Sequence, residues 1–237
     1  MNLLLLGPAD LRPDGLAEVR GRQLRHLQDI LQLNPGESLR VGLIDGLYGQ
    51  AEILEIDAEH ALLRPHFDQQ PPPALPLTLV LALPRPKMLK RILQTCATLG
   101  VKDLYLINAY RVEKSYWGSP WLTPEKIEEN LLLGLEQGID TRLPRVHLRQ
   151  RFKPFVEDEL PAIAAGSRPL VAHPVSNQVC PVAVDEPITL AVGPEGGFIP
   201  YEVEKLQSLG FDSVSLGPRI LRVDTAIPVL LARLFPF

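Results

Sequence analysis

The sequence predicts an α/β protein in two parts, a small β-rich domain followed by a larger domain built on a mostly parallel sheet. Three observations carry this prediction. Short apolar runs separated by Gly, Asp or Pro fill residues 1–70, a proline-rich run occupies 71–76, and apolar strands alternate with amphipathic helices from residue 77 to 237. Alternation of the last kind is typical of parallel α/β sheets, in which a covering helix follows each strand.

The first domain is expected to contain four strands and one helix. The strands are predicted at 2–6, 38–45, 50–56 and 61–67, each an apolar run bounded by turn-forming residues. A helix is predicted between the first two strands, because apolar residues recur there at helical spacing before Asn-Pro-Gly ends the segment at 34–36. Those apolar residues are Leu24, Leu27, Ile30 and Leu31. Residues 71–76 include four prolines, which favour an extended chain, so they are predicted to link the domains.

The second domain is expected to hold at least five strands with helices between them. Strands are predicted at 77–83, 104–108, 170–173, 188–192 and 211–216, and helices at 87–99, 124–138, 154–165 and 200–209. The runs 77–83 and 188–192 are apolar apart from one threonine each, as expected for strands covered on both faces. Asp224 and Thr225 are predicted to cap a final helix, which places Pro228 in its first turn, where a missing N–H is harmless.

The composition excludes several classes of protein. Hydrophobic residues make up 46% and charged residues 22%, the balance of an ordinary soluble globular protein. The opening apolar run at 3–6 is too short for a signal peptide or a membrane-spanning helix. Cys96 and Cys180 lack metal-ligand spacing. We therefore expect a cytoplasmic protein with no membrane partner, no disulfide framework and no metal site.

The charge distribution argues against nucleic-acid binding by bulk electrostatics, which needs many Lys and Arg contacts to phosphate. The formal net charge is −4. Residues 1–70 carry six Arg, no Lys and eleven acids, a net charge of −5, so the remainder carries +1. Any contact with RNA must therefore be made by local clusters of cations.

Two glycine-containing loops near the C-terminus predict a ligand pocket. The loop at 193–198 holds three glycines directly after the buried strand 188–192, and a second loop at 217–222 follows the next strand. Glycine lets the backbone approach a ligand closely, and the carboxyl ends of parallel strands meet at one edge of a sheet. The dinucleotide fingerprint and the P-loop are both missing. For a glycine-rich loop taken alone, a plain tight turn is the alternative.

The same two loops resemble a known family. GPEGGF at 193–198, Glu202 and LGPRILRVDTA at 216–226 resemble the C-terminal motifs of the RsmE methyltransferases of the SPOUT superfamily, with Asp224 in place of the usual Glu. The resemblance implies an S-adenosyl-L-methionine-dependent enzyme that methylates N(3) of a uridine in 16S ribosomal RNA. It also implies a homodimer whose partner is ribosomal RNA or the small ribosomal subunit. Residues 77–237 would form a SPOUT trefoil-knot α/β domain, and residues 1–70 a PUA-like β-barrel that binds RNA.

The resemblance also implies roles for residues of the two loops. The expected cofactor-binding residues are Gly193, Pro194, Glu195, Gly196, Gly197, Leu216, Gly217, Arg219, Ile220 and Leu221. Arg222 is the catalytic candidate, because a fixed cation would stabilise the charge that a deprotonated uracil spreads over its carbonyl oxygens. A structural salt bridge from Arg222 to Asp224 or Glu195 is the alternative. For Glu195, capping of the following helix is the more ordinary use of a carboxylate.

Two clusters of cations are candidates for RNA contact. The first is Arg85, Lys87, Lys90 and Arg91, without an intervening acid, and the second is Arg22, Arg25 and His26, preceded by Arg20. The alternative for both is a solvated helix face.

Some residues of the family pattern are missing. Thr95 and Thr98 stand where the family has Lys and Glu, and Gln32 and Asp140 stand where it has Arg. These differences leave open a methyltransferase that acts on another rRNA or tRNA site, or an inactive RNA-binding paralogue.

Overall fold

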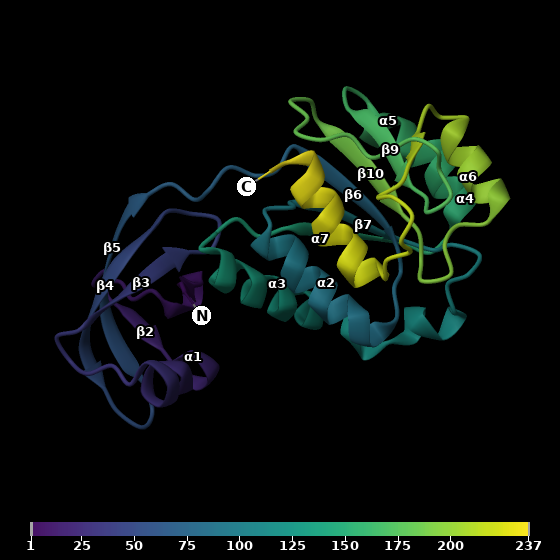
Figure 1. Cartoon of the computed structure of the whole chain (residues 1–237). Coiled ribbons are helices and arrows are strands. Elements are labelled where there is room, and N and C mark those ends of the chain that lie inside the picture. The colour runs from purple at the N-terminus through teal and green to yellow at the C-terminus, as the bar shows by residue number, and fades with distance from the viewer. Residues whose placement is uncertain (1, 237) are drawn as a thin grey trace. The chain divides into compact units, whose positions relative to one another are not determined.

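The computed structural model describes residues 2–236, which fall into two compact units (Figure 1). Unit 1 comprises the chain up to Pro73 together with Leu132–Leu143, and unit 2 comprises Ala74–Leu131 and the chain from Pro144 onward. Segment 132–143 thus clusters with residues that lie far from it in the sequence.

The core of unit 1 is a five-stranded sheet. Its order is β1 (Leu4–Leu6), β3 (Ser38–Leu43), β4 (Tyr48–Ile56), β5 (Ala61–Gln69) and β2 (Ala17–Val19). β1 pairs with β3 in parallel, and the other neighbours are antiparallel. Val41, Ile53 and Leu63 are buried in one apolar cluster. The four predicted strands are confirmed, whereas β2 was not predicted, because only three residues form it and one of them is Glu18.

The predicted helix of unit 1 is confirmed, but its winding differs from the expectation. α1 (Gly21–Arg25) continues into a π-helical segment, His26–Leu31, and the segment ends at Gln32, whose φ of 52° is left-handed. Leu24 and Leu27 are buried in the core, whereas Ile30 is 68% exposed. A π-helix turns less per residue than an α-helix, so the spacing that predicted one apolar face does not keep Ile30 on it.

A buried ion pair joins α1 to segment 132–143 within unit 1. Two guanidinium nitrogens of Arg22 donate to the two carboxylate oxygens of Glu136, at 2.9 and 2.6 Å. The side chain of Glu136 is only 2% exposed, and its backbone carbonyl accepts from the amides of Asn2 and Leu3. The guanidinium of Arg22 therefore neutralises a carboxylate that has almost no access to water.

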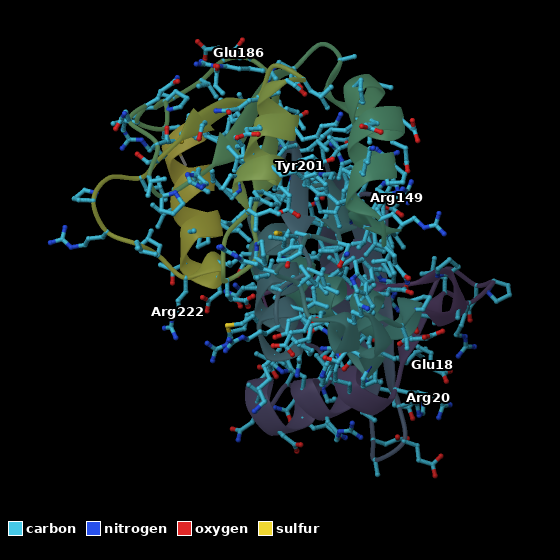
Figure 2. The ribbon with its side chains drawn as sticks, turned by 90° about the vertical axis from the view of Figure 1, so that its right-hand side faces the viewer. Glu18, Arg20, Arg149, Glu186, Tyr201 and Arg222 are labelled. Atoms are coloured by element: carbon cyan, nitrogen blue, oxygen red, sulfur yellow. The ribbon has the colours of Figure 1, made fainter. Side chains whose placement is uncertain are left out.

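Replacing Arg22 with Ala is expected to destabilise the protein by about 2–3 kcal/mol, because it leaves the Glu136 carboxylate buried without its counter-charge. This estimate lies below the range for fully buried pairs because Arg22 itself is 44% exposed. Urea unfolding measures the effect. Arg20→Ala is the matched control, since Arg20 pairs with Glu18 at the surface (Figure 2) and should cost less than about 1 kcal/mol. Equal losses for the two variants would contradict the assignment.

The sheet of unit 2 has six strands, and every neighbouring pair is parallel. Its order is β11 (Asp212–Val214), β9 (Arg168–Ala172), β10 (Ile188–Val192), β6 (Leu77–Ala82), β7 (Asp103–Ile107) and β8 (Arg145–Arg149). All five residues of β10 are buried, in agreement with its continuous apolar sequence. The predicted parallel sheet is confirmed.

Helices connect these strands as expected. They are α2 (Pro86–Thr98), α3 (Pro124–Gly138), α4 (Phe152–Pro154), α5 (Leu160–Ala164), α6 (Pro200–Gln207) and α7 (Val223–Leu234). A π-helical segment, Phe155–Glu159, joins α4 to α5, so the predicted helix at 154–165 is largely confirmed. α2 and α7 pack side by side (Figure 1), α5 packs against β10 and α6 against β11.

Two expectations for unit 2 are wrong. β8 was not predicted, because its sequence, RVHLR, is charged and only partly buried. The final helix begins earlier than expected, since Arg222 is its N-cap and the amides of Thr225 and Ala226 donate to the Arg222 carbonyl. Pro228 is therefore the sixth helical residue, where its missing N–H leaves the Asp224 carbonyl without a helical donor.

The strand order fixes the edge of the sheet at which a ligand can bind. From β6 the chain runs outward through β7 and β8, and it then returns to build β9, β10 and β11 on the other side. Ligands of open α/β sheets bind beyond the carboxyl ends of the strands at such a switch point. Here the switch point lies between the neighbouring strands β6 and β10, so residue 83, which follows β6, and residue 193, which follows β10, lie at it. Among residues 2–236, no helix combines the length and apolar character that a membrane span requires.

Candidate functional site

The two glycine-containing loops enclose a cavity at the carboxyl ends of β9, β10 and β11, which we name the loop cavity. Its volume is about 720 Å³ including the open mouth. Nine of the ten expected cofactor-binding residues line it: Gly193, Pro194, Glu195, Gly197, Leu216, Gly217, Arg219, Ile220 and Leu221. Gly196 is not among the lining residues, and its carbonyl instead accepts a hydrogen bond from the Arg111 guanidinium. The structure therefore brings the two loops together as the strand pattern predicted.

Other walls of the loop cavity were not among the predicted site residues. Ala172 ends β9, His173 and Pro174 follow it, and three residues come from α7: Val223, Ala226 and Leu230. The sequence could have indicated the residues after β9, because β9 was a predicted strand and the carboxyl ends of neighbouring parallel strands lie side by side. Burial lowers the pKa of His173, which favours its neutral form at the cavity wall.

The glycines of the first loop are needed for its shape. A Cβ added to Gly193 would lie 2.9 Å from the amide nitrogen of Phe198, closer than side chains approach backbone. Gly197 has a φ of 73° and donates from its amide to the Pro194 carbonyl at 2.7 Å, which closes the turn. The loop after β10 folds back on itself only because position 193 has no side chain.

Two hydrogen bonds hold this loop and the start of α6 against the segments that follow β6 and β7, and a third is local to the start of α6. The buried carboxylate of Glu202 accepts from the amides of Ile199 at 3.0 Å and Tyr110 at 2.7 Å. The Glu195 carboxylate accepts from the Arg85 amide at 3.0 Å. The expectation that Glu195 caps the following helix is therefore wrong, because Ile199 is the N-cap of α6 and Glu202 supplies the capping carboxylate.

A second cavity adjoins the loop cavity, and we name it the adjoining groove. Its volume is about 1140 Å³ including open solvent. The lining residues are Arg85, Pro86, Lys87, Met88, Tyr116, Glu195, Arg222, Val223 and Asp224. Glu195 and Val223 line both cavities. The expected catalytic residue thus lies in a groove that opens beside the loops.

Arg222 stands at the start of α7, with its side chain directed away from the helix (Figure 2). Within residues 2–236 it forms no ion pair, so the alternative of a salt bridge to Asp224 or Glu195 is wrong. Asp224 also lacks a partner, since its Oδ1 atom is shielded from solvent and accepts no hydrogen bond from the described residues. An unsatisfied buried acceptor costs about 1–3 kcal/mol, and such groups often mark ligand sites.

The structure separates the cations of the first expected RNA cluster. Arg85 and Lys87 line the adjoining groove, whereas Arg91 is an exposed residue of α2 outside it. The ammonium of Lys90 lies 4.2 Å from the centre of the Trp121 ring, a cation–π contact. The groove therefore collects two of the four cations together with Arg222.

The second expected cluster lies in unit 1. Arg22 is engaged by Glu136, and Arg25 is exposed. Burial lowers the pKa of His26, and its Nε2 atom is shielded without a hydrogen-bond partner among the described residues. At neutral pH the neutral form of His26 is favoured, so Arg25 is the exposed cation of this group that bonds to no described carboxylate.

Comparison with known proteins identifies the family. The sequence model of the protein family described as RNA methyltransferase domain matches residues 71–235. The chain belongs to the RNA methyltransferase family. The expected RsmE membership is also confirmed, because similar curated proteins are ribosomal RNA small subunit methyltransferases E. The protein from Treponema pallidum is 27% identical over 95% of this chain and 87% of its own length. That from Synechocystis is 30% identical over 90% and 70%.

Solved methyltransferase structures share the fold of this RNA methyltransferase. A methyltransferase from Legionella pneumophila, solved with bound SAM, has a TM-score of 0.75 at 23% identity and covers 98% of this chain and 97% of its own. The ribosomal RNA small subunit methyltransferase E of Neisseria gonorrhoeae, solved with S-adenosyl methionine, has a TM-score of 0.74 at 20% identity, with 98% and 95% covered. The likeness extends over both units.

Proposed function

We propose that this RNA methyltransferase transfers a methyl group from S-adenosyl-L-methionine to N(3) of a uridine in 16S ribosomal RNA. The observation that carries the proposal is the loop cavity, formed by the two family motifs at the carboxyl ends of β10 and β11. Similar curated proteins are named ribosomal RNA small subunit methyltransferases, and two similar structures hold this cofactor.

The residues of the loop cavity suit an adenosine-containing cofactor. Peptide groups at 193–197 and 216–221 offer hydrogen bonds, and Phe198, Val192 and Leu230 supply apolar walls. The Glu195 carboxylate is the negatively charged group among the lining residues, which suits a cationic ligand. Gly193, without a Cβ, lets the backbone of the loop fold closely around the cavity. S-adenosyl-L-methionine supplies an activated methyl group on a sulfonium.

The adjoining groove suits the methyl acceptor. A uracil imide must lose its N3 proton, to water in the open groove, before it can react, and the resulting negative charge is shared by its two carbonyl oxygens. Arg222 is free of ion pairs among residues 2–236 and lines this groove, so its guanidinium can donate to those oxygens. The proposed catalytic role of Arg222 is this stabilisation of charge.

The same groove provides the local cations that an acidic chain needs for binding RNA. Lys87→Glu is expected to weaken RNA binding about 5- to 10-fold and to reduce the slope of affinity against salt concentration, since Lys87 lines the groove. Lys90→Glu should have a smaller effect on the slope, because Lys90 lies over the Trp121 ring. Fluorescence anisotropy at several salt concentrations measures both.

Lys153→Glu serves as the control for this charge reversal, because Lys153 is exposed in α4 and lines neither cavity. A salt slope that Lys87→Glu leaves unchanged would place the RNA elsewhere on the protein.

Further features of the family are part of the proposal. Support for a trefoil knot comes from the segment 180–184: the Cys180 amide donates to the Ser215 carbonyl beyond β11, and the Val184 amide donates to the Leu234 carbonyl at the end of α7. The five-stranded sheet of unit 1 supports a PUA-like barrel for RNA binding. We also propose a homodimer, which the family resemblance implies, and a cytoplasmic setting, which suits a ribosomal substrate. Sedimentation of the purified protein tests the dimer.

Calorimetry with S-adenosyl-L-methionine and mass mapping of rRNA from a deletion strain test the proposed function. Micromolar binding and loss of one methylated uridine from 16S rRNA are expected. Loss of a modification at another rRNA or tRNA site would replace the target and keep the reaction. No affinity for the cofactor, with RNA supplied, would leave the inactive RNA-binding paralogue as the function.

A further inference from the structure

Among the polar side chains that line the adjoining groove, Tyr116 and Asp224 are given no role by the proposed function. We propose that this groove receives a uracil base turned out of the RNA, that Tyr116 stacks on the base, and that Asp224 accepts a hydrogen bond from its N3–H. The inference rests on the proposed function and adds the residues that select uracil. Enzymes that modify a base commonly extrude it into a pocket, where stacking and contacts to its Watson–Crick edge identify it.

Tyr116 is held in place before any RNA arrives. It lies in a 3₁₀ turn, Lys114–Gly118, and its hydroxyl bonds to the Glu113 carboxylate at 3.1 Å. The next residue, Trp117, donates from its indole nitrogen to the Asn108 side chain at 2.9 Å. These bonds fix the turn, while the Tyr116 side chain stays partly exposed and lines the groove. A fixed aromatic ring at the wall of a groove is the usual platform for an unpaired base.

Asp224 is an acceptor that lacks a donor. Asp224 lines the groove and is partly exposed. Its Oδ1 atom is shielded from solvent and has no hydrogen-bond partner among residues 2–236, so a ligand in the groove would meet the other carboxylate oxygen. No described backbone amide caps onto this side chain, because the N-cap of α7 is Arg222 and the first helical amides bond to the Arg222 carbonyl. An ionised carboxylate accepts hydrogen bonds and donates none. A ligand that presents an N–H to the groove would bond to the oxygen that is not shielded.

The pattern of donors and acceptors in the groove matches uracil better than cytosine. Uracil presents an N–H between two carbonyl oxygens, whereas cytosine presents a bare ring nitrogen beside one carbonyl and an amino group. Asp224 can accept from the N–H, and Arg222, two residues earlier in the chain, can donate to a carbonyl. With cytosine the carboxylate would face the lone pair of the ring nitrogen. Arg85 and Lys87 on the same groove suit the phosphate of the extruded nucleotide.

The test measures binding rather than turnover. The probe is an RNA fragment centred on the nucleotide found by mass mapping, made with uridine or with cytidine at that position. The wild-type protein is expected to bind the uridine fragment about 10-fold or more tightly than the cytidine fragment. Asp224→Asn should reduce this preference to less than about threefold, because the amide can face either base. Asp224→Glu, which restores the acceptor, should keep it.

Three further variants separate the effect of stacking from the effect of charge. Tyr116→Ala should weaken binding of both fragments by about 10-fold, whereas Tyr116→Phe, which keeps the ring, should stay within about threefold of the wild type. Asp185→Asn removes the same charge from an exposed position that lines neither cavity and should keep the wild-type preference. Thermal unfolding of each variant confirms that it is folded.

The outcomes distinguish this inference from the proposed function. If the wild-type protein methylates a uridine but Asp224→Asn keeps the full preference for uridine, only the inference is overturned. If Tyr116→Ala binds as the wild type does, the stacking role is overturned. If the mapped nucleotide is not a uridine, or if the protein binds no cofactor, the inference is overturned together with the proposed function.

Discussion

Arg222→Ala is expected to slow methyl transfer by about 100-fold or more while leaving the affinity for S-adenosyl-L-methionine within about threefold of the wild type. Removing one donor that stabilises developing negative charge typically lowers turnover by about 10²–10³-fold. Arg222 lines the adjoining groove and not the loop cavity, so cofactor affinity should be spared. The folded state should lose little, because Arg222 is exposed and its side chain makes no capping bond.

Single-turnover methyl transfer and calorimetry measure the two quantities separately. Arg151→Ala is the matched control, since Arg151 is exposed and lines neither cavity, and its rate should equal that of the wild type. Arg222→Lys should recover part of the rate, because the charge remains while the planar donor geometry is lost. Undiminished turnover in Arg222→Ala would reject the catalytic role, as would an equal loss in Arg151→Ala.

The elements that could be predicted from the sequence carry a signal in their own residues, either an apolar run or a helix start. β10 occupies 188–192 as expected, because a strand covered on both faces is almost entirely apolar, and Thr189 is its one polar residue. α3 spans Pro124–Gly138 as expected, since Thr123 and Pro124 mark its start. β2 and β8 were missed because each is an edge strand with exposed charged positions, whose hydrogen bonds come from a neighbour distant in the sequence.

The site residues that could be predicted are likewise those with a signal in the neighbouring sequence, and those brought in by long-range contacts could not be predicted. The loops at 193–198 and 217–221 could be predicted, because glycines follow buried strands in the sequence itself. The contribution of Tyr116 to the groove and the bond from the Tyr110 amide to Glu202 could not, because 92 residues separate the partners of that bond. The start of α7 was misplaced because Asp224 has the side chain of an N-cap, while the backbone puts the cap at Arg222.

Gly193→Ala is expected to lower the affinity for S-adenosyl-L-methionine by about 10- to 100-fold and to destabilise unit 2 by about 1–3 kcal/mol. The added Cβ would lie 2.9 Å from the Phe198 amide nitrogen, 3.2 Å from the Phe198 ring and 3.3 Å from the Gly197 carbonyl carbon. Two of these three atoms belong to the backbone of the same loop, so relief requires the loop to move rather than a side chain to turn. That movement would displace the peptide groups that line the loop cavity.

Calorimetry and thermal unfolding of the same samples separate the two effects. Gly118→Ala adds the same methyl group at an exposed position where no atom lies within 4 Å, and it should change neither quantity appreciably. Affinity should fall by more than the loss of stability explains, since the protein remains folded at the temperature of the titration. Wild-type affinity in Gly193→Ala would show that the loop can relax without moving its peptide groups, and the proposal that these groups hold the cofactor would then have to be abandoned.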